Sequence, residues 1–362
     1  MSRPMHDGRV KAVARILVVL MSLGAFGCSA GGDPQGAPRT TATPSAATAT
    51  PTATPTATTP PAAVPTTPTP TSDPPHPVSL PALMATDFDG GDLQVGQVLD
   101  QNSDYTRYAV TYASGELTIS GIMNVPAGDG PFPVLILAHG YIDPDVYTTG
   151  RGLAREQDYL ARAGYVVLHT DYRNHAGSDD EPDNDLRLRL GYAEDVINAV
   201  LAVRSSDLPY LDGDRVGLLG RSMGGGVTYD VLVTAPGLVD AAVVYAPVSS
   251  DASDNFHRWQ RDGPEGEEII QAYGDPSDEP EFWGQRSART FFDRITEPIL
   301  IHHGTADDTC PLEWSYETLD ALEAAGVDAE LIEWEGEPHA FEAAWGESIE
   351  RTAEFFQAHL DG

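Results

Sequence analysis

The sequence predicts an α/β domain with a mostly parallel central sheet, helices on both of its faces and an antiparallel hairpin at its N-terminal side. Apolar runs of strand length alternate with helix-like segments from about residue 131 to the C-terminus. This alternation is typical of a parallel sheet whose strands are joined by right-handed crossovers. Two strand-like segments with alternating side chains precede these runs, and a glycine-rich turn at residues 220–226 joins one run to a helix-like segment.

The hairpin is predicted over Tyr105–Tyr112 and Glu116–Val125, where polar residues alternate with apolar or β-branched ones. Residues 80–104 show no clear pattern and receive no assignment. Val134–Ala138 is a continuous apolar run, which favours a strand buried on both faces.

The later elements follow the same alternation of strands and helices. Helices are expected at Arg151–Ala163, Leu190–Arg204, Gly226–Thr234, Trp314–Ala325 and Glu347–Ala358, and strands at Tyr165–His169, Arg215–Leu219, Ala241–Tyr245, Pro298–His303 and Glu330–Trp334. An acidic segment at about residues 248–292 interrupts the alternation and contains several aromatic residues. It is either a cap over a site or a surface excursion whose aromatic residues form a small core of their own.

The strand that ends at Leu219 runs into Gly220-Arg221-Ser222-Met223-Gly224, a Gly-x-Ser-x-Gly pattern. In a nucleophile elbow a serine stands on a tight turn between a strand and a helix, and flanking glycines leave room for neighbouring backbone. Ser222 is therefore the candidate nucleophile. The backbone N–H of Met223, at the start of the helix, is a candidate oxyanion donor.

A second informative turn, His139-Gly140-Tyr141, follows the buried strand at Val134–Ala138. A turn after a central strand close to the elbow can supply the other oxyanion donor, for which the backbone N–H of Tyr141 is the candidate. His139 is expected to brace this loop by hydrogen bonding.

Ser222, an acidic loop after residue 303 and His339 each follow a predicted strand. Open α/β sheets build their sites at this edge. Residues 105–360 resemble the catalytic domain of the prolyl oligopeptidase family and its esterase relatives among the α/β-hydrolases. The similar motifs are the elbow, the His139-Gly140-Tyr141 turn, the loop Gly304–Pro311 and the end Glu337–Phe341.

This resemblance implies that Ser222 is the nucleophile, His339 the base and Asp307 the acid. Asp307 stands three residues after the loop glycine, and Asp308 is the second candidate. Cys310 stands where the family usually has valine, a small apolar exchange.

The implied activity is that of a serine hydrolase that cleaves carboxylic esters or peptide bonds through an acyl-enzyme, without a cofactor. Prolyl oligopeptidases have a large N-terminal propeller that gates peptides, whereas the corresponding length here is a low-complexity tract. Ester hydrolysis is therefore favoured, with peptide hydrolysis as the alternative. A non-catalytic surface-binding module is the alternative from another class.

The N-terminus predicts export. Residues 1–27 combine basic residues with a short apolar run, as a secretory signal does, and Leu23–Cys28 resembles a bacterial lipoprotein signal. Cys28 would then be lipidated, and the protein would be membrane-anchored or, without lipid, secreted. Residues 28–78 are rich in Thr, Pro and Ala and are expected to form a disordered tether to a domain spanning residues 79–362.

The composition and the positions of His and Cys residues limit which ligands and partners are expected. The 362 residues have a formal net charge of −34, which repels phosphate backbones and argues against a nucleic-acid partner. His302 and His303 are adjacent on a predicted strand, so their side chains face opposite ways and a shared metal ion is not expected. If Cys28 bears lipid, Cys310 has no partner for a disulfide bond. The expected substrate is a small ester or short peptide, and the sequence leaves the oligomeric state open.

Overall fold

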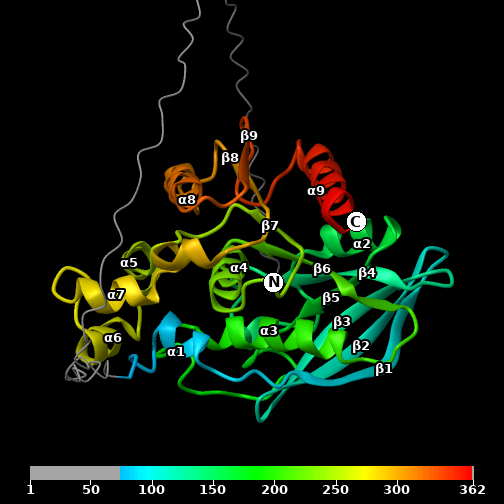
Figure 1. Cartoon of the computed structure of the whole chain (residues 1–362), viewed down its shortest axis with the longest axis horizontal. Coiled ribbons are helices and arrows are strands. Elements are labelled where there is room, and N and C mark those ends of the chain that lie inside the picture. Colours follow the sequence, from blue (N-terminus) through cyan, green and yellow to red (C-terminus); the bar gives the residue numbers. More distant parts are fainter. Residues whose placement is uncertain (1–73, 361–362) are drawn as a thin grey trace, which may run out of the picture. The chain divides into compact units, whose positions relative to one another are not determined.

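The computed structural model describes residues 74–360, which contain one nine-stranded sheet (Figure 1). Its strand order is β1-β2-β3-β5-β4-β6-β7-β8-β9. The strands are β1 (Gly91–Gln101), β2 (Tyr105–Ser114), β3 (Leu117–Pro126), β4 (Phe132–Ala138), β5 (Val166–Thr170), β6 (Leu211–Arg221), β7 (Ala241–Tyr245), β8 (Ile299–Gly304) and β9 (Ala329–Trp334).

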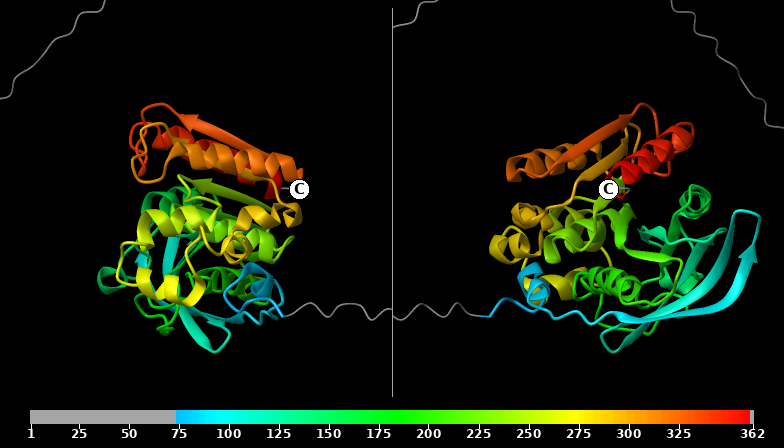
Figure 2. Two further views of the ribbon diagram at one scale, coloured as in Figure 1. Left: turned by 90° about the vertical axis from the view of Figure 1, so that its left-hand side faces the viewer. Right: turned by 45° about the vertical axis from the view of Figure 1, so that its right-hand side comes forward.

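Both parts of the predicted sheet are present. From β5 through β4, β6, β7 and β8 to β9 every pair is parallel, and β1, β2 and β3 add an antiparallel edge. Figure 2 shows the long β1 and β2 at this edge. The β2–β3 pairing runs in register from Tyr105 opposite Pro126 to Ser114 opposite Leu117, which confirms the hairpin.

Helices cover both faces of the sheet. They are α1 (Leu80–Met84), α2 (Ala154–Arg162), α3 (Gly191–Arg204), α4 (Met223–Thr234), α5 (Ala252–Asn255), α6 (Gly266–Tyr273), α7 (Pro280–Arg286), α8 (Leu312–Ala325) and α9 (Trp345–Leu360), with short turns η1 (Pro144–Val146), η2 (Phe256–Gln260) and η3 (Ala288–Arg294). One apolar core lies between the sheet and α1, α3, α4 and α8, and a second lies between the sheet and α2 and α9.

Strand β4 shows why the central runs are continuously apolar. Val134 and Ile136 belong to the first core, whereas Leu135 and Leu137 belong to the second. Successive side chains of a strand point to opposite faces, so a strand covered on both sides needs an apolar residue at every position. All four side chains are fully buried.

Residues 80–104, which the sequence pattern left unassigned, form α1 and the edge strand β1. Most of β1 is exposed, so it lacks the apolar alternation that identifies a half-buried strand. The packed region also begins before residue 79, since Val78 is buried and the His76 ring contacts the rings of Tyr273 and Phe282.

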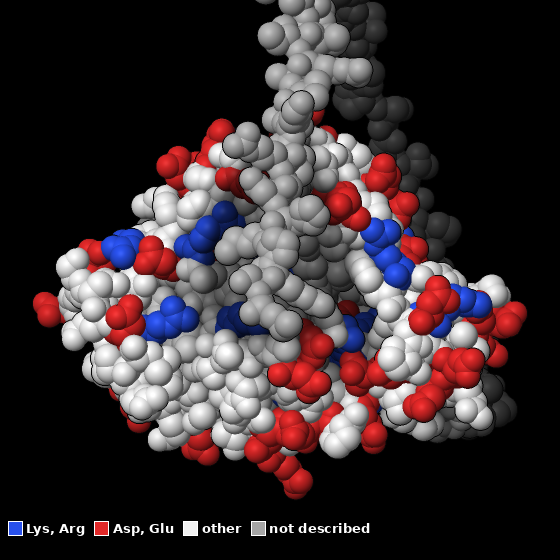
Figure 3. Space-filling model, turned by 180° about the vertical axis from the view of Figure 1, so that it is seen from behind, with Lys and Arg blue, Asp and Glu red and all other residues white. Residues whose placement is uncertain are grey.

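The predicted signal, the lipidation of Cys28 and the tether up to residue 73 lie outside the described residues. Within residues 74–360, no helix combines the length and the apolar character that a membrane span requires. Figure 3 shows acidic side chains spread over the visible face with arginines among them.

The segment at residues 248–292 forms α5, η2, α6, α7 and η3. Its Phe256 and Trp283 are buried and belong to the first apolar core rather than to a separate one. The same segment forms one wall of the cavity described below.

Candidate active site

Ser222 stands between the end of β6 and the first residue of α4, with φ of 55° and ψ of −119°. A residue other than glycine rarely adopts a positive φ, and such a conformation costs on the order of 1–3 kcal/mol. The flanking glycines make the turn possible. A Cβ atom on Gly220 would lie 2.2 Å from the Gly224 carbonyl oxygen, and one on Gly224 would lie 2.0 Å from that of Ala138.

The loop after β4 lies against this elbow. A Cβ atom on Gly140 would lie 3.2 Å from the Cβ of Ser222 and 3.3 Å from the Arg221 carbonyl oxygen, so glycine lets this loop lie against the elbow without displacing it. The next residue, Tyr141, has a half-exposed side chain whose ring lies beneath the Arg189 guanidinium, 4.9 Å from ring centre to Cζ.

His139 is buried beside this loop and does not line the cavity that Ser222 lines. Its ring nitrogens lie 2.7 Å from the Gly140 carbonyl oxygen and 3.2 Å from that of Asp171. Burial lowers the pKa of His139 to about 4. A neutral ring held in this way stabilises the loop.

Asp307 lies in the loop after β8 and His339 in the loop after β9, and their side chains are in contact. His339 Nδ1 lies 2.8 Å from Asp307 Oδ2, and the Asp307 side chain is fully buried. The other carboxylate oxygen accepts hydrogen bonds from the backbone N–H groups of Thr309 and Cys310, at 2.8 and 2.9 Å. Asp308 is exposed and has no contact with His339 among the hydrogen bonds of the described residues.

His303 is a further contact of this acid. Its Nε2 lies 3.3 Å from Asp307 Oδ2 and 3.0 Å from the Cys310 carbonyl oxygen, and its Nδ1 lies 2.6 Å from Ser315 Oγ. Burial alone would raise the pKa of Asp307, but hydrogen bonds with His303 and His339 outweigh it and hold that pKa well below its usual range. Asp307 is therefore ionised at neutral pH.

The neighbouring His302 faces the other side of the sheet. It contacts Thr352 of α9 and accepts a hydrogen bond from Trp334. The two histidines thus diverge, as adjacent strand residues must. The described residues include no group of three or more His, Cys, Asp or Glu side chains that could hold a metal ion.

Cys310 connects the acid loop with the elbow. It is buried and forms no disulfide bond with the described residues. Burial and the nearby Asp307 charge raise the pKa of its thiol to about 12, against the effect of a hydrogen bond with Ser222. The thiol is therefore protonated, and its contact places Ser222 close to the loop that holds Asp307.

Two residues of α2, Arg155 and Glu156, join the elbow to the loop after His339; we call them the α2 brace. The buried Glu156 Oε1 accepts hydrogen bonds from Arg221 Nη2 at 2.5 Å and from Trp345 Nε1 at 2.9 Å. Arg155 Nη2 donates to the carbonyl oxygens of residues 340 and 341, at 2.6 and 3.0 Å. Arg221 directly precedes Ser222, so the brace fixes the elbow and the histidine loop relative to each other.

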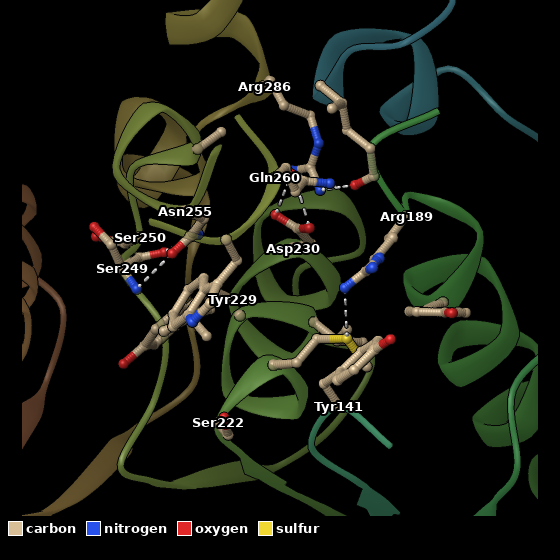
Figure 4. A pocket seen from close by; sticks show the side chains of 18 of the residues that line it. Tyr141, Arg189, Ser222, Tyr229, Asp230, Ser249, Ser250, Asn255, Gln260 and Arg286 are labelled. Carbon is tan, nitrogen blue, oxygen red and sulfur yellow. Dashed lines mark hydrogen bonds and ion pairs between the residues drawn. The ribbon is translucent and has the colours of Figure 1, made fainter. Parts of the chain in front are cut away.

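Ser222 and His339 both line a cavity of about 530 Å³ (Figure 4). Its walls come from α4, from residues 188–192 and from the segment at residues 248–292. A serine hydroxyl and an imidazole on one cavity, with the imidazole held by a buried carboxylate, are suited to acyl transfer.

The sheet, the elbow and this set of side chains are those of the serine hydrolases with an α/β-hydrolase fold. Residues 152–362, more than half of the chain, match the model of the prolyl oligopeptidase family. The chain belongs to this family.

Curated relatives agree with this assignment. The chain is 28% identical over 244 residues to an uncharacterized peptidase, YuxL, of Bacillus subtilis, a match that covers 64% of this chain and 35% of the relative. It is 26% identical over 248 residues to a probable dipeptidyl peptidase 4 of Aspergillus flavus, covering 65% of this chain and 31% of the relative. The chain thus spans about a third of the length of these relatives.

Solved structures share the fold. Acetyl xylan esterase 1 from Thermoanaerobacterium has a TM-score of 0.58 at 19% identity, covering 76% of this chain and 92% of its own. A putative dipeptidyl aminopeptidase IV from Bacteroides ovatus has a TM-score of 0.58 at 21% identity, covering 72% of this chain and 37% of its own.

Proposed function

We propose that the protein is an exported serine hydrolase that cleaves carboxylic esters through an acyl-enzyme on Ser222. The observation that supports this most strongly is the His339–Asp307 contact of 2.8 Å at the wall of the cavity that Ser222 also lines. Because Nδ1 of His339 faces Asp307, its Nε2 is left to accept the serine proton.

In the first half of the reaction, Ser222 Oγ forms a bond to the carbonyl carbon and passes its proton to His339. The carbonyl π electrons move to oxygen, and the tetrahedral intermediate then expels the alcohol oxygen, which takes the proton from His339. In the second half, water adds to the acyl carbon as His339 accepts its proton. Collapse of this intermediate releases the acid and returns the proton to Ser222.

The oxyanion would be held by the backbone N–H groups of Met223 and Tyr141. Met223 is the first residue of α4, where N–H groups have no partner within the helix. The close approach of Gly140 to Ser222 supports the role of Tyr141, the next residue. Loss of one such donor costs roughly 2.7–4 kcal/mol of activation free energy in serine hydrolases.

Ester hydrolysis is proposed ahead of peptide hydrolysis because an alcohol leaves with less help than an amine. The fold shared with acetyl xylan esterases, over 92% of the first one's length, is in keeping with this choice. Peptide hydrolysis is the second candidate, because curated relatives bear the names of peptidases.

Purified protein should be assayed with short p-nitrophenyl esters and aminoacyl p-nitroanilides. We expect faster turnover of the esters, and Ser222→Ala should reduce it by about 10⁶-fold. Ser277→Ala, which changes an exposed serine, is the matched control. Faster anilide turnover would favour the peptidase, and a folded protein inert towards both would favour a non-catalytic binding module.

Export and lipidation of Cys28 belong to the same proposal and are supported by the sequence pattern of residues 1–28. Full-length protein produced in a bacterium should fractionate with membranes and begin with a lipid-modified Cys28 by mass spectrometry. Cys28→Ala should abolish the modification. An unmodified, membrane-free wild-type product would contradict lipidation.

A further inference from the structure

The cavity beside Ser222 extends along α4. Met223, Val227 and Asp230 of this helix all line it. Because an α-helix rises 1.5 Å per residue, Asp230 lies about 12 Å from Ser222 along the helix axis. Figure 4 shows Ser222 at one end of the view, with Asp230, Gln260 and Arg286 towards the other.

Part of the cavity wall is apolar and is formed by Leu188, Met223, Val227, Val248, Trp283 and Ala288, whereas Arg189, Ser249, Ser250 and Asn255 add polar groups to it. An apolar chain attached to the reacting carbonyl would be buried against these apolar side chains. Such burial contributes about 25 cal/mol of binding free energy per Å² of apolar surface removed from water.

The far end is polar. Asp230 Oδ2 lies 3.1 Å from Arg286 Nη1, and the two side chains are only 10% and 11% exposed. Arg286 Nη2 donates to the Leu188 carbonyl oxygen at 2.9 Å, but its buried Nε has no hydrogen-bond partner among the described residues. The buried hydroxyl of Tyr229, another lining residue, also has none there.

These groups favour one kind of ligand tip. A hydrocarbon tip would cover the ion pair without making a hydrogen bond. An anionic tip would face Asp230 and a cationic one would face Arg286, and either would lose its own hydration. A neutral hydroxyl or amide can donate a hydrogen bond to Asp230 and accept one from Arg286 or from the Tyr229 hydroxyl, and it adds no charge to the site.

We propose that this cavity binds acyl groups that have an apolar stem and a neutral hydrogen-bonding tip, a hydroxyl or amide, about 12 Å from the carbonyl. This inference rests on the proposed acyl-enzyme. The cavity extends from Ser222 along α4 past Val227 to Asp230, so an acyl chain attached to Ser222 can lie in it. The cavity therefore selects the acyl part of the ester.

The test compares two p-nitrophenyl esters of equal acyl length, undecanoate and 10-hydroxydecanoate, whose extended chains reach the proposed distance, with p-nitrophenyl acetate as a short reference. Wild-type protein should show a kcat/KM about 10-fold higher for the hydroxy ester, because a buried site built for hydrogen bonding discriminates against an analogue without the polar group. The double variant Asp230→Leu with Arg286→Met should lose this preference, because its apolar replacements leave no unpaired charge.

A matched control makes the same two kinds of change in an exposed ion pair of α9, Glu354→Leu with Arg351→Met. This variant should keep the preference, and circular dichroism checks the folding of both variants. Equal turnover of the two long esters by wild-type protein would overturn the inference while acetate hydrolysis still supported the proposed function. Persistence of the preference in the cavity variant would also overturn it. Absence of acetate hydrolysis would instead contradict the proposed function itself.

Discussion

At the scale of the residue, the elbow is the feature that the sequence predicted most directly. Gly220 and Gly224 have no room for a Cβ atom, and Ser222 has a positive φ. Such constraints act within five consecutive residues, so they leave a readable pattern. The contact between Asp307 and His339 spans 32 residues, and only the resemblance to a family paired them.

Replacement of Asp307 tests its assignment as the acid that orients His339. Asp307→Asn should lower kcat for ester hydrolysis by roughly 10⁴-fold, because the amide no longer stabilises the correct tautomer and the charged form of His339. Asp308→Asn is the matched control, since this adjacent carboxylate is exposed. Its kcat should remain within about twofold of wild type, as most surface substitutions change energies by less than 0.5 kcal/mol. Steady-state kinetics on p-nitrophenyl acetate measure both, and a larger loss in Asp308→Asn would contradict the assignment.

Other residues of the site could not be predicted. His303 looked only like half of a weak metal pair, yet it contacts Asp307 and Ser315. Glu156 is a charged residue of α2 that is buried in the folded protein. Its carboxylate accepts hydrogen bonds from Arg221 and Trp345, which lie 65 and 189 residues away in sequence. No local pattern marks such a partner, because the three segments meet only in the folded chain.

At the scale of the element, the buried strands were predicted best. For β7 the predicted and observed bounds coincide at Ala241–Tyr245, and α3 differs from its prediction only at the first residue. These segments are apolar because they are covered by helices. The exposed strand β1 has no such constraint and was missed.

The α2 brace gives a prediction at this scale. Glu156→Gln should leave the guanidinium of Arg221 without its counter-charge and reduce the free energy of unfolding by about 3 kcal/mol. A shift of the elbow relative to the histidine loop should also lower kcat, by up to about 100-fold, with a smaller change in KM. Urea unfolding and steady-state kinetics measure the two effects.

Glu350→Gln, at an exposed position of α9, is the control for this change of charge. The brace would have no role in positioning if Glu156→Gln lost stability but kept the wild-type kcat at a temperature where it is folded.

At the scale of the whole molecule, the two cores on either side of the sheet enclose histidines that are held neutral. Burial, with a smaller effect from the Arg351 charge, lowers the pKa of His302 from the ordinary 6.5 to about 3. Its Nδ1 accepts a hydrogen bond from Trp334 Nε1 at 3.0 Å, so protonation would break this contact.

The pH dependence of stability follows from this shift. Between pH 6.5 and about 3 the unfolded chain binds a proton at residue 302 that the folded chain does not, so the free energy of unfolding falls as the pH falls. The contribution approaches about 1.4 kcal/mol per pH unit. His302→Gln should show a shallower decline between pH 6.5 and 4.5 in chemical denaturation, and equal slopes for the two proteins would contradict the assignment.

The role of Ser222 as the nucleophile is tested most directly by mapping the residue that a fluorophosphonate probe modifies in the purified protein. Peptide mapping by mass spectrometry should find the phosphonyl adduct on Ser222, and labelling should disappear in Ser222→Ala and fall strongly in Asp307→Asn. An adduct on another residue, or labelling that persists in Ser222→Ala, would contradict the account.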